Sequence, residues 1–413
     1  MPRRRRTVAQ HARLRSPHPL GQLAKLLAVA AVVGVVSTVG VVSYTAYDLT
    51  ADFVEEAVVV ENQPPVPPDL RQLAGGVNMV LVGIDACEEE LVALLGERCE
   101  GADAGGRLND VTILVHISEA PRKVTVVSFP RDLIFEAPAC DTADGGRFGG
   151  GTLQINQLYT YGGLSCVITA VADISGQSIP FGAMVTFGGV IEITNAIGGV
   201  EVCLASDMRD RNTGIDWKAG PRTIQGVEAL QFLRTRYGVG GSDLARVGNQ
   251  QQYMSRLARK LVSEDVLSNP STVLRLASTG LRNVTPTQSL TNPLTLVQVA
   301  SAVKDVPFED IVFVQYPTVT AGSDANRVAP DYAAAEVLWD ALRENRSIEV
   351  TGRVSVNDGT VVADPAPGEE ARPTQNPSVE PGEVDPDTGA VALPSAITGS
   401  SAAQQTCSAG VVN

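Results

Sequence analysis

The stretch VTVVSFPRDLIF, at residues 124–135, combines an apolar, β-branched run with an abrupt stop. The composition of Val124 to Phe129 is typical of a buried strand. Pro130 then ends the pairing, because it has no backbone N–H to donate, and Arg131 and Asp132 follow before the chain turns apolar again. A plain turn explains this pattern, and so does an active site at a strand end.

Similar apolar runs recur along the chain and alternate with segments of helical periodicity. The expected strands are 78–85 (NMVLVGID), 111–117 (VTILVHI), 123–129, 200–204 (VEVCL) and 311–317 (IVFVQYP). Helices are expected at 154–176, 226–236, 249–264 and 330–345, and 184–199 reads as a strand feeding a helix. This alternation predicts an α/β domain, a layered α-β-α arrangement with a central mixed sheet.

The N-terminus carries a basic block followed by an apolar run. Residues 1–25 hold seven positive charges and no acid, and residues 26–47 (LLAVAAVVGVVSTVGVVSYTAY) are 22 residues without a charge. Such a run is long enough to span a bilayer, and the positive-inside rule then places the N-terminus in the cytoplasm and the rest outside the cell. A cleaved signal peptide is the alternative, although the run exceeds the usual apolar core of one. We therefore expect a single-pass protein of the cell membrane.

The rest of the chain is acidic and divides by composition. The total net charge of −14 leaves −21 on residues 26–413, which argues against nucleic acid as a partner. We expect a cytoplasmic tail at 1–25, the transmembrane helix at 26–47, a Pro-rich extracellular spacer at 48–77 and a globular domain at 78–346. Residues 347–413, rich in Pro, Gly and acids, are predicted to be mostly disordered.

All six cysteines lie beyond the apolar run, and no C-x-x-C pair occurs. An even number in an exported domain predicts disulfides, with 15 possible connectivities. We favour Cys87–Cys99 and Cys140–Cys166, each of which closes a short loop, and Cys203 with Cys407 remains by elimination.

Several catalytic chemistries lack the residues they need. His116 is the only histidine beyond the apolar run, and its place in the middle of a strand favours a core role over a base. No G-x-x-x-x-G-K-[ST] motif occurs. What remains is a set of charges at strand ends and on one helix: Asp85, Arg107, Asp110, Arg131, Asp132, Arg234, Arg236, Asp243 and Arg246. Each alone fits a solvated ion pair. Together, arginines suit a multiply charged phosphate and aspartates suit Mg²⁺ beside it.

The chain resembles the LytR-CpsA-Psr family of bacterial cell-wall enzymes. The matching stretches occur in family order over about residues 78–345: NMVLVGID, RLNDVTILVHI, VVSFPRD, QINQLYTYGG, ITNAIGGVEVCL, AGPRTIQGVEALQFLRTRYGVGGSDLARVGNQQQY and NRVAPDYAAAEVLWDAL. Composition rich in Ala, Val and Arg, with the extra cysteines, is similar to that of actinobacterial members. That resemblance is compatible with arabinogalactan and with a teichoic-acid-like polymer, and the sequence leaves the choice open.

The resemblance implies transfer of a glycopolymer from a polyprenyl-diphosphate carrier to peptidoglycan, with formation of a phosphodiester. Asp85 and Asp110 would hold Mg²⁺. The diphosphate would be bound by Arg107, Arg131, Arg234, Arg236, Arg246, Gln250 and Gln251. Candidate liners of the family's apolar prenyl groove are Val185, Phe187, Ile191 and Phe232, each of which also suits ordinary core packing.

Some roles stay open. Asp132 or Asp110 is the candidate base for the attacking hydroxyl, and Asp132 is alternatively the partner that orients Arg131. Three positions depart from the family pattern: Gln154 stands where Lys is frequent, Asn249 where Arg is frequent, and Arg107 lies one residue further from Asp110 than in many members. A non-catalytic protein that binds polyprenyl-phosphate lipids and regulates wall assembly is the alternative function. A transcription attenuator fits neither the outward topology nor the acidic charge.

Overall fold

The computed structural model describes residues 51–60 apart from 52, 76–88, 107–142, 145–262, 269–322, 327–352, 359–363, 380–386 and 389–411, with 63, 66, 70, 91–92 and 99. Contacts divide the chain into residues 1–51 and 52–413, and the description below concerns the second unit. The basic tail and the predicted span at 26–47 lie outside the described residues. Within the described ranges, no helix has both the length and the apolarity needed to cross a membrane.

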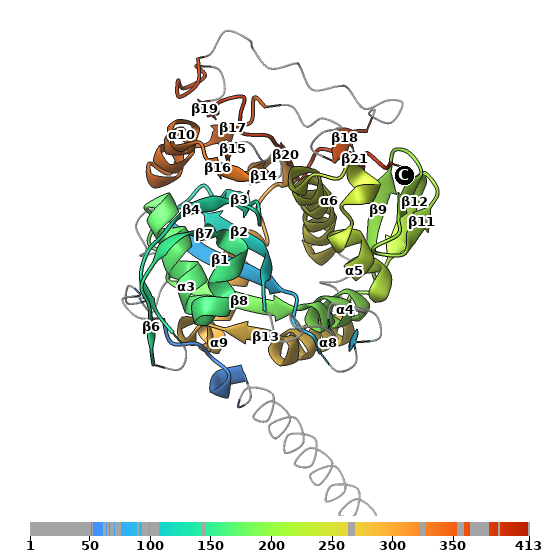
Figure 1. Ribbon diagram of the computed structural model, residues 1–413, viewed down its shortest axis with the longest axis horizontal. Coiled ribbons are helices and arrows are strands. Elements are labelled where there is room, and N and C mark those ends of the chain that lie inside the picture. The colour runs from blue at the N-terminus through green and yellow to red at the C-terminus, as the bar shows by residue number, and fades with distance from the viewer. Residues whose placement is uncertain are drawn as a thin grey trace, which may run out of the picture. The chain divides into compact units, whose positions relative to one another are not determined.

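A seven-stranded mixed sheet forms the centre of the domain (Figure 1). In spatial order its strands are β13 (Val284–Pro286), β8 (Phe181–Thr186), β1 (Val77–Ile84), β2 (Asn109–Ile117), β3 (Val124–Phe129), β14 (Ile311–Gln315) and β20 (Gly399–Ser401). The pairs β1–β8 and β3–β14 are parallel and the other neighbours are antiparallel. The predicted central mixed sheet is therefore confirmed.

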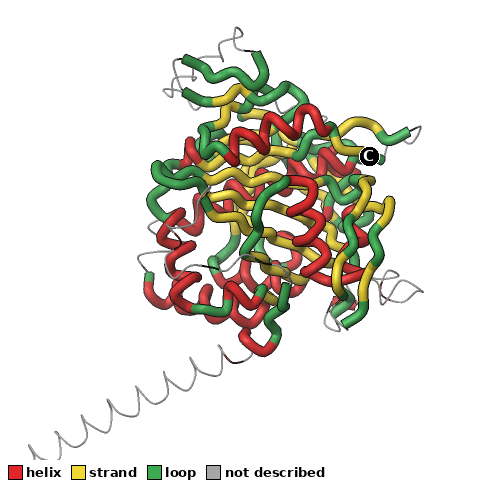
Figure 2. Tube along the Cα trace, turned by 90° about the vertical axis from the view of Figure 1, so that its left-hand side faces the viewer, coloured by secondary structure: helices red, strands yellow, loops and turns green. Residues whose placement is uncertain are grey.

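Helices cover both faces of this sheet, and Figure 2 shows helices (red) around the strands (yellow). Side chains of β1 alternate between two apolar cores, as the pleat of a strand requires. Val80, Val82 and Ile84 pack with α3 (Leu158–Ser175) and α10 (Tyr332–Arg343). Met79 and Leu81 face the opposite core, which includes residues of α6 (Asp243–Val262) and α9 (Pro293–Val303). The result is the expected α-β-α layering.

A second, four-stranded sheet lies beside the first. Its order is β12 (Gly220–Ile224), β9 (Val200–Leu204), β21 (Thr406–Ser408) and β18 (Thr360–Val362). It shares an apolar core with α5 (Val227–Arg234) and α6. The remaining helices are α4 (Phe187–Ala196), α8 (Pro270–Asn283), η4 (Ile155–Gln157), η5 (Tyr237–Val239), η6 (Gln288–Leu290) and η7 (Phe308–Asp310).

Short two-stranded ribbons complete the described structure. They pair β10 (Met208–Asp210) with β11 (Ile215–Trp217), β4 (Ile134–Ala137) with β7 (Gly151–Gln154), β5 (Cys140–Asp141) with β6 (Arg147–Phe148), β15 (Thr318–Thr320) with β16 (Val328–Pro330), and β17 (Ile348–Glu349) with β19 (Val391–Ala392).

The prediction of a mostly disordered C-terminal tail is wrong for residues 389–411. Strand β20 adds to the edge of the central sheet by pairing with β14, and β21 pairs with β9 and β18. Leu393 and Ile397 are fully buried in the main core. The short apolar runs VALPSAITGSS and TCSAGVV follow a Pro-rich stretch, and the composition of that stretch dominated the prediction. These runs have just enough apolar surface to dock on an existing core.

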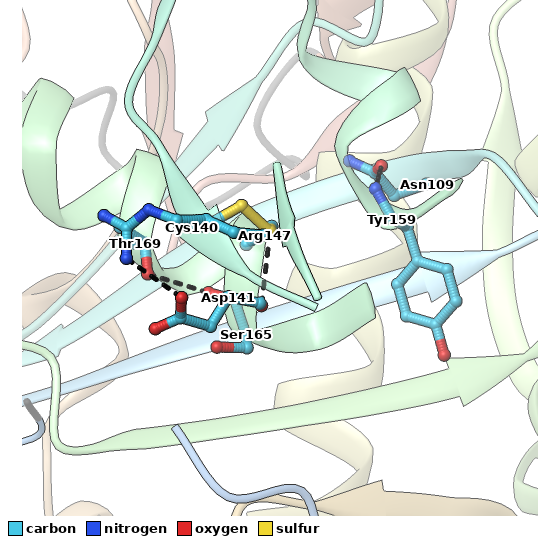
Figure 3. The surroundings of a disulfide bond; sticks show 8 residues. Asn109, Cys140, Asp141, Arg147, Tyr159, Ser165 and Thr169 are labelled. Atoms are coloured by element: carbon cyan, nitrogen blue, oxygen red, sulfur yellow. Dashed lines mark hydrogen bonds and ion pairs between the residues drawn. A yellow bond between two sulfur atoms is a disulfide. The ribbon is translucent and has the colours of Figure 1, made fainter. Parts of the chain in front are cut away.

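Three disulfides confirm the two favoured cysteine pairs and the pair reached by elimination: Cys87–Cys99, Cys140–Cys166 and Cys203–Cys407. Figure 3 shows Cys140 beside Asp141, whose carboxylate pairs with Arg147 at 3.0 Å. Helix α3 passes this bridge at a kink, and a Cβ at Gly162 would lie only 1.9 Å from the sulfur of Cys166. Glycine is therefore needed where the helix meets the disulfide.

His116 confirms its predicted core role. It is buried in β2, and its Nδ1 lies 2.8 Å from the side-chain oxygen of Asn78. Burial lowers the pKa of His116 to about 4, so the ring is neutral at physiological pH.

Candidate active site

A β-bulge places Asp110 at the end of the central sheet. In the register between β1 and β2, Gly83 faces Val111 and Ile84 faces Asn109, so Asp110 is the extra residue. Bulges re-aim side chains and are frequent beside active sites. Asp85 follows β1 at the same end, and its buried carboxylate accepts a hydrogen bond of 2.8 Å from the backbone N–H of Leu108. Two buried carboxylates therefore stand on neighbouring strands.

Arg131 lies directly beyond the end of β3 and faces these carboxylates. Its Nη1 donates to Asp110 Oδ1 at 2.5 Å, and its Nε lies 3.7 Å from Asp132 Oδ1. Its backbone N–H donates to Asp243 at 3.0 Å. Burial lowers the pKa of Arg131, but the charges of the three aspartates outweigh burial and raise the pKa overall. The guanidinium is thus charged and held by Asp110 and Asp132, while Asp243 holds the backbone.

Asp132 is the centre of a cluster of cations. Its carboxylate lies 3.7 Å from Arg131, 3.8 Å from Arg236 and 3.7 Å from Arg327, and it accepts a hydrogen bond of 3.0 Å from Gln154 Nε2. A carboxylate that lies between three guanidiniums and accepts a hydrogen bond from an amide holds those groups in place. The geometry therefore favours the orienting role for Asp132 over that of a base.

Asp210 of β10 shapes the loop that carries Arg236. One of its carboxylate oxygens accepts hydrogen bonds from the Thr235 hydroxyl and from the backbone N–H groups of Arg236, Tyr237 and Gly238, at 2.8 to 3.4 Å. Burial raises the pKa of Asp210, but these hydrogen bonds outweigh burial and hold the pKa below its usual value. The loop after α5 is therefore fixed by a buried anion.

Helix α6 supplies one arginine and two glutamines. Arg246 is buried and pairs with Asp243, while Gln250 donates to the carbonyl of Leu233 at 3.0 Å. Burial raises the pKa of Asp243, although the charge of Arg246 opposes that rise. Gln251 is buried, and its Nε2 has no hydrogen-bond partner among the described residues.

Two cavities of opposite character meet at the Arg131–Asp110 ion pair. The first, which we call the polar cleft, has a volume of about 610 Å³. It is lined by Leu108, Arg131, Asp132, Gln154, Asn156, Gln157, Arg236, Tyr237, Gly241 and Arg327. The second, which we call the apolar cavity, has a volume of only about 40 Å³. It is lined by Gly83, Asp110, Val111, Val185, Phe187, Val190, Leu230, Leu233, Arg234, Arg246 and Gln250.

The structure brings most of the predicted site residues to one of these two cavities. Arg234 and Arg236 sit on either side of the end of α5 and line different cavities, with the Arg234 guanidinium 5.1 Å from the ring centre of Phe187. Asp85, Arg107 and Gln251 are not among the lining residues: Asp85 is fully buried, and Arg107 is exposed at the surface.

The four candidate groove residues fall in three places. Val185 and Phe187 line the apolar cavity, and Ile191 packs beside it against a small core that contains Phe187 and Leu230. Phe232 is fully buried in the neighbouring core, where its ring stacks on Trp217 at 6.2 Å between centres. Position 232 is on the side of α5 that faces the second sheet, so it serves packing there.

Sequence reasoning missed Arg327 and Asp210 as site residues. Arg327 precedes β16 within the stretch NRVAPDY, whose resemblance to the family was noted without assigning the arginine a role. Asp210 stands in MRDRN, among several surface charges, and nothing in that local pattern predicts its four contacts. Gln154, which stands where the family often has Lys, lies in the polar cleft, and its amide contacts Asp132.

The chemistry of the donor set fits a magnesium ion. Asp85 and Asp110 offer carboxylate oxygens from adjacent strands, and Mg²⁺ is usually bound through one or two carboxylates together with phosphate oxygens of a substrate. Among the residues that the structure describes, no group of three or more His, Cys, Asp or Glu side chains gathers as a complete metal cage. A site of this kind would draw its remaining ligands from a bound phosphate and water.

Comparisons with known proteins agree with this architecture. A model described as the LytR_cpsA_psr family matches residues 43–344. The chain is 30% identical to the cell wall biosynthesis protein LcpA of Corynebacterium glutamicum, over 51% of this chain and 44% of LcpA. It is 29% identical to the probable cell wall biosynthesis protein LcpB of the same organism, over 65% of this chain and 61% of LcpB. It is 24% identical to the polyisoprenyl-teichoic acid–peptidoglycan teichoic acid transferase TagU of Enterococcus faecalis, over 50% of this chain and 60% of TagU.

These matches span about half the length of the relatives.

Solved structures share the fold. A LytR-Csp2A-Psr enzyme from Actinomyces oris matches with a TM-score of 0.52 at 19% identity, covering 69% of this chain and 94% of the other. A structure of TagT bound to LIIa-WTA matches with a TM-score of 0.51 at 16% identity, covering 70% and 98%. With its family model matched over most of its length, its mixed sheet and its relatives in Corynebacterium, this chain belongs to the LytR-CpsA-Psr family.

Proposed function

We propose that this protein transfers an anionic or secondary wall glycopolymer from a polyprenyl-diphosphate carrier to peptidoglycan, in a Mg²⁺-dependent reaction that forms a phosphodiester. The observation that carries the proposal is the Arg131–Asp110 pair, which lies where the polar cleft meets the apolar cavity. A polyprenyl-diphosphate glycan has the same order of parts: an apolar chain, a charged diphosphate and a polar glycan. Relatives such as TagU are named as transferases of teichoic acid to peptidoglycan, which supports the same reaction class.

The prenyl chain would enter at the apolar cavity, against Val185, Phe187 and Leu230. The surrounding helices would have to move apart for this, because the cavity volume of about 40 Å³ is far smaller than a prenyl chain. Burial of prenyl carbon stabilises the complex by roughly 25 cal/mol for each Å² of apolar surface removed from water. The diphosphate would then lie beside Arg131, with Arg234 and Arg246 on the side of the apolar cavity and Arg236 on the side of the polar cleft. Charge-assisted hydrogen bonds to its oxygens are the strongest contacts available there. Mg²⁺ would be held by Asp85 and Asp110 and would neutralise phosphate charge when bound.

The reaction is a phosphoryl transfer. A hydroxyl oxygen of peptidoglycan attacks the phosphorus on the sugar side of the diphosphate. A new O–P bond forms, the bond from that phosphorus to the bridging oxygen breaks, and polyprenyl phosphate leaves. Positioned arginines stabilise the charge that builds on the leaving oxygen, which is the main demand of such a step. Asp110 or Asp132 would accept the hydroxyl proton, since both carboxylates lie beside Arg131.

The chain would work at the outer face of the cell membrane, anchored by residues 26–47 with the N-terminus in the cytoplasm. This placement rests on the charge and apolarity of residues 1–47. It would give the domain access to both a membrane-embedded lipid donor and the peptidoglycan acceptor.

Turnover by the full-length protein tests the proposal. Detergent-solubilised protein with a polyprenyl-diphosphate glycan, peptidoglycan oligomers and Mg²⁺ is expected to give a phosphodiester product, detectable by mass spectrometry and ³¹P NMR. A matched sample of Asp110→Asn should give little product. If the protein binds the donor but forms no product under any acceptor or Mg²⁺ condition, the alternative, a non-catalytic lipid-binding regulator, is correct.

A further inference from the structure

The C-terminal end of the chain returns to the back of the site. Strand β21 pairs with β18 and touches β9, and Cys407 in β21 is bonded to Cys203 in β9, 204 residues earlier. We call residues 359–362 and 406–411 the C-terminal clamp. Its members Thr360, Thr406, Cys407 and Ser408 are buried, so this segment is an integral part of the fold.

The clamp joins the two helices that carry Arg234 and Arg246. Asn249, fully buried on α6, donates from Nδ2 to the carbonyl of Phe232 on α5 at 2.7 Å, and its Oδ1 accepts a hydrogen bond from the Ser408 hydroxyl. Phe232 precedes Arg234 by two residues, and Asn249 follows Arg246 by three. One buried amide therefore links α5, α6 and the clamp.

A second contact lies directly beside Arg246. Gly359 has φ +74°, and a Cβ there would lie 2.0 Å from the carbonyl oxygen of Ala245. The clamp backbone thus packs against the turn of α6 that presents Arg246, at a distance only glycine permits. Further along α6, Gln252 Nε2 donates to the carbonyl of Cys203 at 3.0 Å, which ties the helix to the disulfide itself.

A third contact reaches the loop of Arg236. The backbone N–H of Val411 donates to the carbonyl of Gly238 at 2.7 Å, and the N–H of Arg209 donates to the carbonyl of Val411 at 2.9 Å. Gly238 is two residues from Arg236 and is also held by Asp210. The clamp therefore contacts the segments that carry Arg236 and Arg246 directly, and it reaches the helix that carries Arg234 through Asn249.

We propose that the C-terminal clamp positions these three arginines for the diphosphate, with Asn249 and Ser408 as positioning residues and Cys203–Cys407 as the lock. The inference rests on the proposed function, in that the bound group is a prenyl diphosphate. Chain ends fray unless they are tied down, and a cross-link between distant residues removes most of the entropic cost of docking such an end. Asn249 thus acts from behind the cavity, through the helices that present the arginines.

Binding of two probes to the full-length protein tests the clamp. Geranylgeranyl diphosphate requires both the apolar cavity and the arginines, whereas geranylgeraniol requires the cavity alone. We expect Cys203→Ser/Cys407→Ser to raise the Kd for the diphosphate about tenfold and Ser408→Ala about threefold, with the Kd for the alcohol unchanged. A merely structural defect would weaken both probes together.

Thr351→Val is the matched control. Thr351 donates to the carbonyl of Leu393 at 2.6 Å, so it also holds the C-terminal chain, but at the main core and away from α6. It should bind both probes as the wild type does. Ser408→Ala keeps the test decisive if the disulfide variant does not fold. A wild-type Kd for geranylgeranyl diphosphate in Ser408→Ala overturns the clamp proposal, whereas absence of transfer by the wild-type protein would overturn the proposed function instead.

Discussion

The polar cleft and the apolar cavity share one boundary, the Arg131–Asp110 pair, yet they are built in different ways. The cleft is wide, and its cations are arranged around a single anion, Asp132. The cavity is narrow and mostly aliphatic, with Arg234 and Arg246 among its lining residues. Loops that follow strands and helices form the first, whereas helix faces packed against the sheet form the second. The contrast indicates that the site suits an amphiphilic ligand with an apolar end, a polar end and a charged group between them.

Loss of Arg131 should have the largest effect, because this residue belongs to the boundary itself. Arg131→Ala removes a charged donor to the diphosphate and leaves Asp110 and Asp132 without their nearest counter-charge. We expect kcat/KM to fall about 10³-fold, measured as phosphodiester formation. Arg131→Lys should recover only part of the rate, since an ammonium cannot bridge two carboxylates as a guanidinium does. Turnover near the wild-type level in Arg131→Ala would show that the boundary is not the reaction centre.

Removal of the metal should come next. Chelation with EDTA is expected to stop transfer, and Asp85→Asn should lower kcat about 10²-fold while raising the Mg²⁺ concentration needed for half-maximal rate. Glu201→Gln, which neutralises an exposed carboxylate on β9, is the control and should titrate like the wild type. Full activity in EDTA would assign the two carboxylates a role other than metal binding.

Replacement of Asp210 tests how the loop that carries Arg236 is held, and its effect on the free energy of unfolding should depend on pH. Because its folded-state pKa lies below the usual value, Asp210 stabilises the protein above about pH 4, the unfolded-state value. That contribution disappears as pH falls through the folded-state pKa. Asp210→Asn should therefore lower the free energy of unfolding by about 2 kcal/mol at pH 7, measured by urea denaturation.

The stability difference between Asp210→Asn and the wild type should shrink as the pH is lowered through the folded-state pKa of Asp210, where the wild-type carboxyl also becomes protonated. Asp216→Asn, an exposed aspartate on the adjoining β11, provides the comparison. A stability difference that is constant across this pH range would mean that hydrogen bonding to a charged Asp210 is not what fixes the loop.

The apolar cavity should give the smallest effect, since one side chain supplies a fraction of its surface. Val185→Asn is expected to raise the Kd for geranylgeranyl diphosphate about tenfold, which corresponds to about 1.4 kcal/mol and to the burial of less than one large apolar side chain. Binding of inorganic pyrophosphate should not change. Val319→Asn, at an exposed valine of β15, is the control. Equal weakening of both ligands in Val185→Asn would place the prenyl chain elsewhere.

Sequence patterns predicted the centre of this fold well and its margins less well. The strands β1, β2, β3, β9 and β14 were predicted because each is an apolar run that is buried along most of its length. Helix α6 begins at Asp243, six residues before the predicted start, since its first turn is polar and buried by contacts with the site. Strands β20 and β21 are three residues each, too short for periodicity to reveal.

The site residues divide in the same way, into those that a local sequence pattern indicates and those that it does not. Arg131 was predictable because it follows the end of β3, an obvious strand. Asp110 was predictable because it lies at the start of β2, the strand before β3. The contacts of Asp210, Asn249 and Arg327 join segments between 17 and 195 residues apart, so no local pattern indicates them. Phe232 was a candidate groove liner from the family resemblance, with core packing as the alternative, and the structure places it in the core beside the second sheet.

A structure of the full-length protein with geranylgeranyl diphosphate and Mg²⁺ tests the central claim most directly. The account predicts that the phosphates lie within hydrogen-bonding distance of Arg131, with prenyl carbons against Val185 and Leu230 and the open polar cleft beyond. Prenyl carbons in the polar cleft, or phosphates held away from Arg131, would contradict it.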